Sequence, residues 1–150
     1  MEFDETDYSI LNALVEDARL SSRSIAQRVG VSPATVMARL KRLEVEKVVR
    51  GYSARLDYEK LGYDVDVIIE LSISKGKLFA LEKKLASEEC VQAVYDVTGE
   101  SDALVVARFK SRRAMDKFLK HIQTYDFVEN TNTKLVLNTI KDEALKISLA

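Results

Sequence analysis

The apolar positions of the first 49 residues recur with the period of a helix. Between residues 21 and 49 they predict a short helix, a turn at Gly30, and a second helix that begins after Ser32. A serine oxygen accepts a first-turn N–H group and a proline fits the next position, so the second helix has a defined start. An earlier helix, capped by Asp4 and running to about Ala18, is expected to bury Leu11, Leu14, Val15 and Ala18, with Ile10 beside them.

The second helix of the pair has two different faces. At about 100° per residue, three apolar residues share the face expected in the core: Val36, Leu40 and Leu43. The outer face is small, polar and basic, with Ala34, Thr35, Ala38, Lys41 and Arg42. Small residues let a helix enter the major groove of DNA, and longer donors reach bases and phosphates. This helix is therefore predicted to be a DNA-recognition helix.

The same region is locally basic. Between Arg19 and Leu43 the sequence has no Asp or Glu, and its ionisable residues are Arg19, Arg23, Arg28, Arg39, Lys41 and Arg42. In a chain of net charge −1 this is a local positive region of the kind that nucleic-acid-binding surfaces show. A basic helix face is also often simply solvated. The helix pair alone therefore leaves both DNA binding and an ordinary all-α core open.

From Tyr63 onward the apolar period changes to two. The first predicted strand alternates apolar residues with mostly polar ones: Val65, Val67, Ile69, Leu71 and Ile73. A helix, two strands joined by a turn at residues 98–102, a second helix and a last strand from about Val128 to Ile140 follow. This order is that of a ferredoxin-like βαββαβ domain, in which both helices cover one face of an antiparallel sheet.

The predicted fold class is α+β with two domains. A helix-turn-helix domain spans residues 1–49, a linker with a short strand spans 50–62, and the ferredoxin-like domain spans 63–150. The sheet face away from the helices is expected to carry Ile68, Val94, Leu104, Val106, Val136 and Ile140. This is too much apolar surface to leave in water, so we expect a homodimer in which two such faces pair. Two helix-turn-helix units would then suit a palindromic DNA site.

Composition and candidate chemistry exclude several classes of protein. One cysteine in 150 residues excludes an internal disulfide and a thiolate metal cluster, and indicates a reducing, cytoplasmic environment. No apolar run approaches the roughly 18 residues of a membrane span. The single histidine, His121, and the single cysteine, Cys90, fit ordinary positions better than catalytic ones. We therefore expect neither an enzyme nor a bound metal or cofactor.

Three segments of the chain carry a family resemblance: VSPATVMARLKRLE, the linker RGYSARLDYEKLG and the turn TGESD. Together they resemble the Lrp/AsnC family of transcriptional regulators, and the match covers nearly the whole chain. The resemblance implies a regulator of double-stranded DNA that forms dimers, and often octamers, through its C-terminal domains. Many members bind a free amino acid between neighbouring dimers. Lys47 departs from the pattern, because relatives usually carry glycine at the end of the recognition helix.

The resemblance also implies an effector site where the motifs match. Its expected residues are Thr98, Gly99, Glu100, Ser101, Asp102, Thr131 and Thr133. Turn N–H groups can hold a carboxylate, Asp102 can pair with an ammonium group, and threonine hydroxyls can satisfy either end of an amino acid. Simpler explanations stay open: a hairpin turn at Gly99, a turn cap at Asp102 and strand propensity for the threonines.

Geometry assigns roles within the predicted DNA-contact set. The residues placed near base edges are Ser32, Ala34, Thr35 and Ala38, of which Thr35 is the preferred candidate for a specific contact. Arg23, Lys41 and Arg42 are expected to contact phosphates. Arg39 lies toward the core, where an ion pair with an acid such as Asp17 and a DNA contact are both open.

The sequence therefore predicts a sequence-specific transcriptional regulator, dimeric or larger, that is modulated by an amino acid. One alternative is an architectural protein that compacts DNA with little sequence preference. Another is a metabolite sensor whose helix-turn-helix has become a protein-interaction surface. The salt dependence and the sequence preference of DNA binding separate the three.

Overall fold

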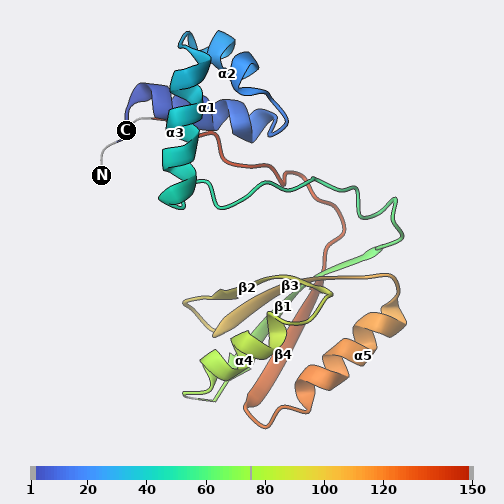
Figure 1. The fold of residues 1–150 in the computed structure, drawn as a ribbon. Coiled ribbons are helices and arrows are strands. Elements are labelled where there is room, and N and C mark those ends of the chain that lie inside the picture. Colours follow the sequence, from blue (N-terminus) through green and yellow to red (C-terminus); the bar gives the residue numbers. More distant parts are fainter. Residues whose placement is uncertain (1–2, 75, 149–150) are drawn as a thin grey trace. The chain divides into compact units, whose positions relative to one another are not determined.

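The computed structural model describes residues 3–74 and 76–148, and its contacts divide the chain into two compact units (Figure 1). One unit joins residues 1–55 to residues 141–150, and the other comprises residues 56–140. The first unit contains three helices: α1 (Glu5–Glu16), α2 (Ser22–Val29) and α3 (Pro33–Val45). The second unit contains a four-stranded sheet and two helices.

Each helix of the first unit begins with a capping side chain. Asp4 accepts the N–H of Asp7 at 2.9 Å, and the Asp7 carboxylate accepts the N–H of Asp4 at 3.2 Å, which makes a capping box. Ser21 and Ser32 start α2 and α3, each accepting a first-turn N–H at 3.1 Å. Gly30, with φ 79°, turns the chain between these two helices. The predicted caps and turn are confirmed.

The core of this unit draws buried residues from all three helices: Ile10, Ala13, Ile25, Ala26 and Val36. Val36 and Leu43 are fully buried, as the face assignment of α3 predicted. The stripe predicted for the first helix is wrong in part. Val15 is exposed, and Ala18 is exposed beyond the helix end at Glu16, because the apolar spacing continues past the extended residue that terminates the helix.

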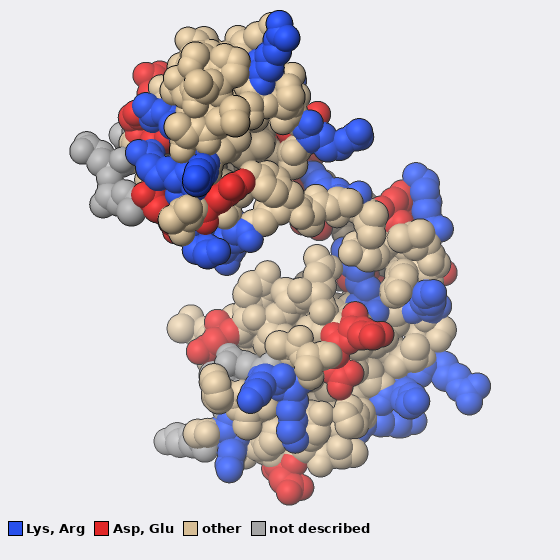
Figure 2. Space-filling view, viewed as in Figure 1, with Lys and Arg blue, Asp and Glu red and all other residues tan. Residues whose placement is uncertain are grey.

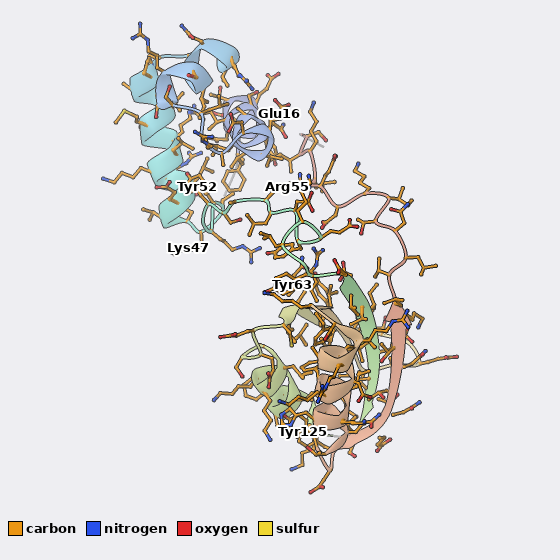
Figure 3. All side chains as sticks on the ribbon, turned by 90° about the vertical axis from the view of Figure 1, so that its right-hand side faces the viewer. Glu16, Lys47, Tyr52, Arg55, Tyr63 and Tyr125 are labelled. Carbon is orange, nitrogen blue, oxygen red and sulfur yellow. The ribbon has the colours of Figure 1, made fainter. Side chains whose placement is uncertain are left out.

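The C-terminal residues return to the first unit. The side chain of Asn12 in α1 makes two hydrogen bonds to the backbone of Ile147: Nδ2 donates to the carbonyl oxygen at 2.7 Å, and Oδ1 accepts the N–H at 3.0 Å. Arg55, labelled in Figure 3, donates to the backbone carbonyl of Asp142. The tail is therefore held against α1.

The short strand predicted in the linker is wrong. In the described part of the chain, residues 48–56 carry no strand assignment. A strand needs a neighbouring ladder for its backbone groups, and this segment is fixed by a side chain instead: the Tyr52 hydroxyl donates to Glu44 at 2.8 Å. Just before it, Lys47 has φ 60°, the left-handed conformation that glycine favours at the end of a helix (Figure 3).

The second unit has the predicted ferredoxin-like βαββαβ order. Its elements are β1 (Val65–Ile73), α4 (Leu78–Leu85), β2 (Val91–Asp96), β3 (Ala103–Phe109), α5 (Arg112–Gln123) and β4 (Val128–Leu135). The sheet is antiparallel with strand order β2-β3-β1-β4, and both helices cover one face (Figure 1). The last strand is shorter than predicted, because it ends at Leu135 and Ile140 lies beyond it, 89% exposed.

The two faces of the sheet differ in burial. The helix-covered face forms the core with α4 and α5 through Val67, Ile69, Leu71, Val105, Ala107, Leu81, Leu85, Phe118 and Ile122. The opposite face, called here the open sheet face, carries half-buried apolar residues in neighbouring strands: Ile68, Leu104, Val106 and Val136. Val94, which was predicted on this face, pairs with Val105 and packs into the core. A register shift between Val91 and Ala93 inverts the alternation of β2, so that prediction is wrong.

Candidate functional site

The outer face of α3 presents most of the predicted DNA-contact residues to solvent. Those exposed are Ser32, Ala34, Ala38, Lys41 and Arg42, together with Arg23 in α2. Thr35 is half-buried, and its hydroxyl oxygen lies 2.8 Å from that of Ser32 within the helix cap. Met37 was not predicted as a contact, yet it is 63% exposed and lies three residues after Ala34, on the same face. That spacing is the signal by which the sequence could have identified it.

A cluster of opposite charges joins α1 to α3. The Asp7 carboxylate is only 1% exposed and contacts Arg39 at 3.0 Å and Arg42 at 2.5 Å. Arg39 also contacts Asp4 at 2.6 Å. These four residues are called here the α1–α3 cluster. Asp7 is the charged side chain that is buried in the described part of the core. A buried carboxylate is tolerated only when it is paired and hydrogen-bonded, and this one is both.

The cluster shifts the pKa values of Asp4, Asp7 and Arg39 toward the charged forms. Burial raises the pKa of Asp7, but hydrogen bonds from Arg39, the Asp4 backbone and Arg42 outweigh burial and hold that pKa below its ordinary value of 3.8. The hydrogen bond from Arg39 lowers the pKa of Asp4 in the same direction. The pKa of Arg39 is raised by its hydrogen bonds to Asp4 and then Asp7. All three groups are therefore ionised at neutral pH.

The ion pairs reduce the positive region predicted from the sequence. Arg28 contacts Glu16 at 3.3 Å, so with Arg39 and Arg42 three of the six basic residues of that region have acidic partners from α1. Figure 2 accordingly shows acidic and basic side chains interspersed on this unit. The suggested partner Asp17 does not pair with Arg39, because it lies at the opposite end of α1 from the cluster, where it accepts the N–H of Arg19 at 2.9 Å.

Two of the residues predicted to contact phosphates have cationic groups that are available to bind DNA. Arg23 and Lys41 are exposed, and within the described residues no acidic partner is recorded for either of them. Lys41 belongs to the same exposed face of α3 as Ala34 and Ala38, which are small enough for close approach. The arrangement presents a small-residue face with isolated cations beside it, as a helix that enters the major groove requires.

The predicted effector turn connects β2 to β3 in the second unit. Gly99 has φ 125° within it, a conformation that glycine favours. Asp102 closes the turn: its Oδ2 accepts the N–H of Ile73 at 2.7 Å, and its own N–H donates to the carbonyl of Leu71 at 2.9 Å. Asp102 therefore caps the turn and ties it to the end of β1.

The predicted effector threonines lie near the same end of the sheet. Ala103, Leu71 and Thr131 occupy one row across three neighbouring strands, so Thr131 is separated from the turn by the width of β1. The Thr131 hydroxyl accepts the Gln123 side-chain amide at 3.2 Å, and Thr133 lies opposite Ile69 on the same face. The structure thus places the turn and Thr131 at the same end of the sheet, on either side of β1, where backbone N–H groups and a hydroxyl are available.

Other reactive side chains occupy ordinary positions. Burial raises the pKa of the Cys90 thiol, which disfavours the nucleophilic thiolate. His121 is exposed, and its Nε2 lies 3.0 Å from the hydroxyl of Tyr125, which is labelled in Figure 3. Among the residues that the structure describes, no group of three or more His, Cys, Asp or Glu is placed to hold a metal ion, and no helix has the length and hydropathy to cross a bilayer.

Comparison with known proteins covers both units. Residues 3–44 match the AsnC-type helix-turn-helix domain, and residues 66–145 match the Lrp/AsnC ligand binding domain. An uncharacterized HTH-type transcriptional regulator of Pyrococcus furiosus is 42% identical over 143 residues, which cover 95% of this chain and 97% of the relative.

Solved structures of two relatives have the same fold. A transcriptional regulator of Neisseria meningitidis in complex with L-Met has a TM-score of 0.89 at 30% identity, covering 98% of this chain and 97% of that one. AsnC of E. coli has a TM-score of 0.89 at 28% identity, covering 98% of this chain and 100% of its own.

Replacing the buried carboxylate tests the α1–α3 cluster. The pKa of Asp7 is lower in the folded than in the unfolded chain. The ionised carboxylate therefore makes its full contribution to folding stability at pH values above its unfolded-state pKa, and this contribution is lost as the pH falls through its folded-state pKa. Asp7→Asn should lower stability at neutral pH by roughly 1.5–3 kcal/mol, the range for hydrogen bonds to a charged group. It should also reduce the stability that is lost as the pH falls below about 5 and through the lowered folded-state pKa of Asp7. Amide hydrogen exchange in α1 and α3 measures both the loss of stability at neutral pH and its dependence on pH.

The matched control is Asp57→Asn in the second unit. Asp57 pairs with Lys60 at 2.8 Å in an exposed position, and such pairs contribute little. The control should leave exchange in α1 and α3 unchanged. Wild-type protection of these helices in Asp7→Asn at neutral pH would show that the cluster does not hold them together.

Proposed function

Because this chain belongs to the Lrp/AsnC family of transcriptional regulators, we propose that it is a sequence-specific regulator that acts as a homodimer or larger assembly and responds to a free amino acid. Family membership supplies DNA binding by the helix-turn-helix and a ligand-binding domain. Sequence specificity, assembly and effector class are the proposed parts. The observation that carries the proposal is the exposed small-residue face of α3, capped by Ser32 and fixed to α1 through Arg39 and Arg42.

Charge favours specific contacts over compaction. A DNA-compacting protein binds mainly by neutralising phosphates, which requires many available cations. Here Arg28, Arg39 and Arg42 are paired with acids, and the whole chain has a net charge of −1. Arg23 and Lys41 then contact phosphates and position the protein on DNA, while the exposed face of α3 discriminates among base sequences.

A titration of selected against shuffled DNA tests this proposal. Duplexes are first selected from a random pool by the protein, then compared with shuffled versions at one near-physiological salt concentration. We expect a preference of about a thousandfold or more for the selected sequence. Lys41→Ala should weaken both duplexes about equally and reduce the salt slope by about one. Lys117→Ala on α5 is the matched control and should change neither.

The alternatives give different results. Equal affinity for the two duplexes with a steep salt slope would identify a DNA-compacting protein. An absence of binding to both at low salt would favour a sensor whose helix-turn-helix no longer contacts DNA.

The open sheet face supports assembly with a second copy. Ile68 and Val106 are neighbours in the middle of this face and are both half-buried. Ion pairs flank them: Asp66 contacts Arg108 at 3.2 Å, and Glu70 contacts Lys134. An apolar centre with a charged rim is the composition of a protein interface. A two-fold axis through the face would bury its apolar centre in both copies at once.

Val106→Lys tests this assembly. The new ammonium groups would oppose one another across the two-fold axis and lie near Lys134, so we expect the dimer to dissociate to monomers in light-scattering measurements at micromolar concentration. Lys117→Glu on the helix-covered side is the control and should leave the mass unchanged. An unchanged mass for Val106→Lys would place the interface on another surface.

The effector proposal rests on the turn closed by Asp102 and on Thr131, which lies at the same end of the sheet across β1. Turn N–H groups suit a carboxylate, and the anchored Asp102 carboxylate suits an ammonium group, so the site favours a zwitterion over a simple anion. The Neisseria meningitidis relative was solved with L-Met, which is the same chemical class. We infer that a free amino acid binds at this end of the sheet.

Thermal unfolding with each of the twenty amino acids tests the effector. At least one should raise the melting temperature, since a ligand that binds only the folded state stabilises it. Thr131→Val keeps the side-chain shape but removes the hydroxyl, and should weaken that binding about tenfold. Ser87→Ala, whose hydroxyl donates to Lys84 at 2.7 Å near the opposite end of the sheet, is the control. Equal affinities for Thr131→Val and wild type would exclude Thr131 from the site.

A further inference from the structure

The exposed face of α3 carries an apolar residue that the assigned roles leave unexplained. Ala34, Met37, Ala38 and Lys41 recur at the i, i+3, i+4, i+7 spacing of one helix face, and all four are exposed. Met37 is 63% exposed, whereas Val36 beside it is completely buried. At the centre of a face of small side chains, the Met37 side chain is available for contact when that face binds, and methionine is enriched in interfaces.

The polar side chains of α3 that normally read bases are already engaged. The Thr35 hydroxyl lies 2.8 Å from Ser32 Oγ in the helix cap. Arg39 contacts both Asp4 and Asp7, and Arg42 contacts Asp7 at 2.5 Å. Direct hydrogen-bond readout of bases needs side-chain donors or acceptors that point into the groove. On the face defined above only the ammonium group of Lys41 can donate, so shape and apolar contact carry the remaining information.

One feature of the major groove is apolar. Thymine presents its C5-methyl group there, and the other bases present hydrogen-bonding groups at their edges. An unbranched methionine adapts its three torsions to such a target and makes dispersion contacts through a polarisable sulfur. Ala34 and Ala38 flank Met37 with single methyl groups, so the helix can approach closely enough for the side chain to reach the base pairs.

We infer that Met37 is a specificity-determining residue, and that it reads thymine through the C5-methyl group in the major groove. The inference rests on the proposed sequence-specific DNA binding and adds to it the residue and the base that it recognises. It also moves the main base contact from Thr35 to a side chain two positions later, which faces outward while Thr35 serves the cap.

Replacing thymine by uracil removes only the methyl group and leaves charge and base pairing unchanged. Each thymine of the selected duplex is replaced in turn, and affinity is measured for wild type and for Met37→Ala. For wild type, we expect one or two positions in each half-site at which uracil weakens binding about fourfold, the effect of exposing one buried methyl group. For Met37→Ala, that penalty should disappear, and affinity for the thymine duplex should fall to that of wild type for uracil.

Three further variants sharpen the test. Met37→Leu keeps apolar bulk and should keep the uracil penalty. Met37→Gln has similar length with an amide, and should shift preference at the same position toward adenine. Val45→Ala removes another exposed apolar side chain, 72% exposed at the end of α3, and should behave as wild type. Since Met37 lies outside the core, circular dichroism should show all variants folded.

The outcomes separate this inference from the proposed function. Failure of the wild type to select any sequence would overturn both. Selection with no uracil penalty at any thymine, or with a penalty that survives in Met37→Ala, would overturn the role of Met37 alone. A change in molecular mass for Met37→Ala without a change in DNA preference would assign Met37 to a protein contact and overturn the inference.

Discussion

The presentation of the recognition helix depends on one buried carboxylate. Asp7 lies in the first turn of α1, yet it binds two arginines of α3, 32 and 35 residues later. The same residue completes the capping box that starts α1. A single side chain thus begins one helix and fixes the orientation of another, so helix start and helix packing are coupled in this unit.

This coupling decides which charges reach DNA. An arginine held by carboxylates is a poor phosphate ligand, because binding would break a charge-assisted hydrogen bond that already exists. The arginines of the α1–α3 cluster therefore serve the fold, and the outward face of α3 is left with alanines, a methionine and a lysine. Because Arg39 and Arg42 are paired, α3 presents few free cations to DNA, which suits discrimination among sequences more than tight binding to any DNA.

Features determined by neighbouring residues could be predicted from the sequence. The caps at Asp4, Ser21 and Ser32 and the turn at Gly30 are local, and the βαββαβ order follows from changes of apolar period. For the candidate sites, the exposed face of α3 followed from helical spacing. The effector residues depended on family resemblance, and their roles stay predictions.

Errors arose where distant segments meet or where a strand is irregular. Arg39 finds its acids at the start of α1, which no spacing within α3 reveals. Val94 changes face because of a register shift in β2, and a shift of one residue inverts every later side chain. Met37 is a different case: methionine usually fills cores, but its spacing of three residues from Ala34 places it on the outer face of α3.

The bonds between Asn12 and Ile147 affect how this chain is made. The helix unit is built from both ends of the polypeptide, with the sheet unit inserted between them, and these partners are 135 residues apart. During synthesis, α1 to α3 emerge before the sheet unit, whereas the segment that completes their unit emerges after it. The chain also crosses between the units twice, so after one proteolytic cut near residue 55 the two fragments would be held only by non-covalent contacts such as those of Asn12 with Ile147.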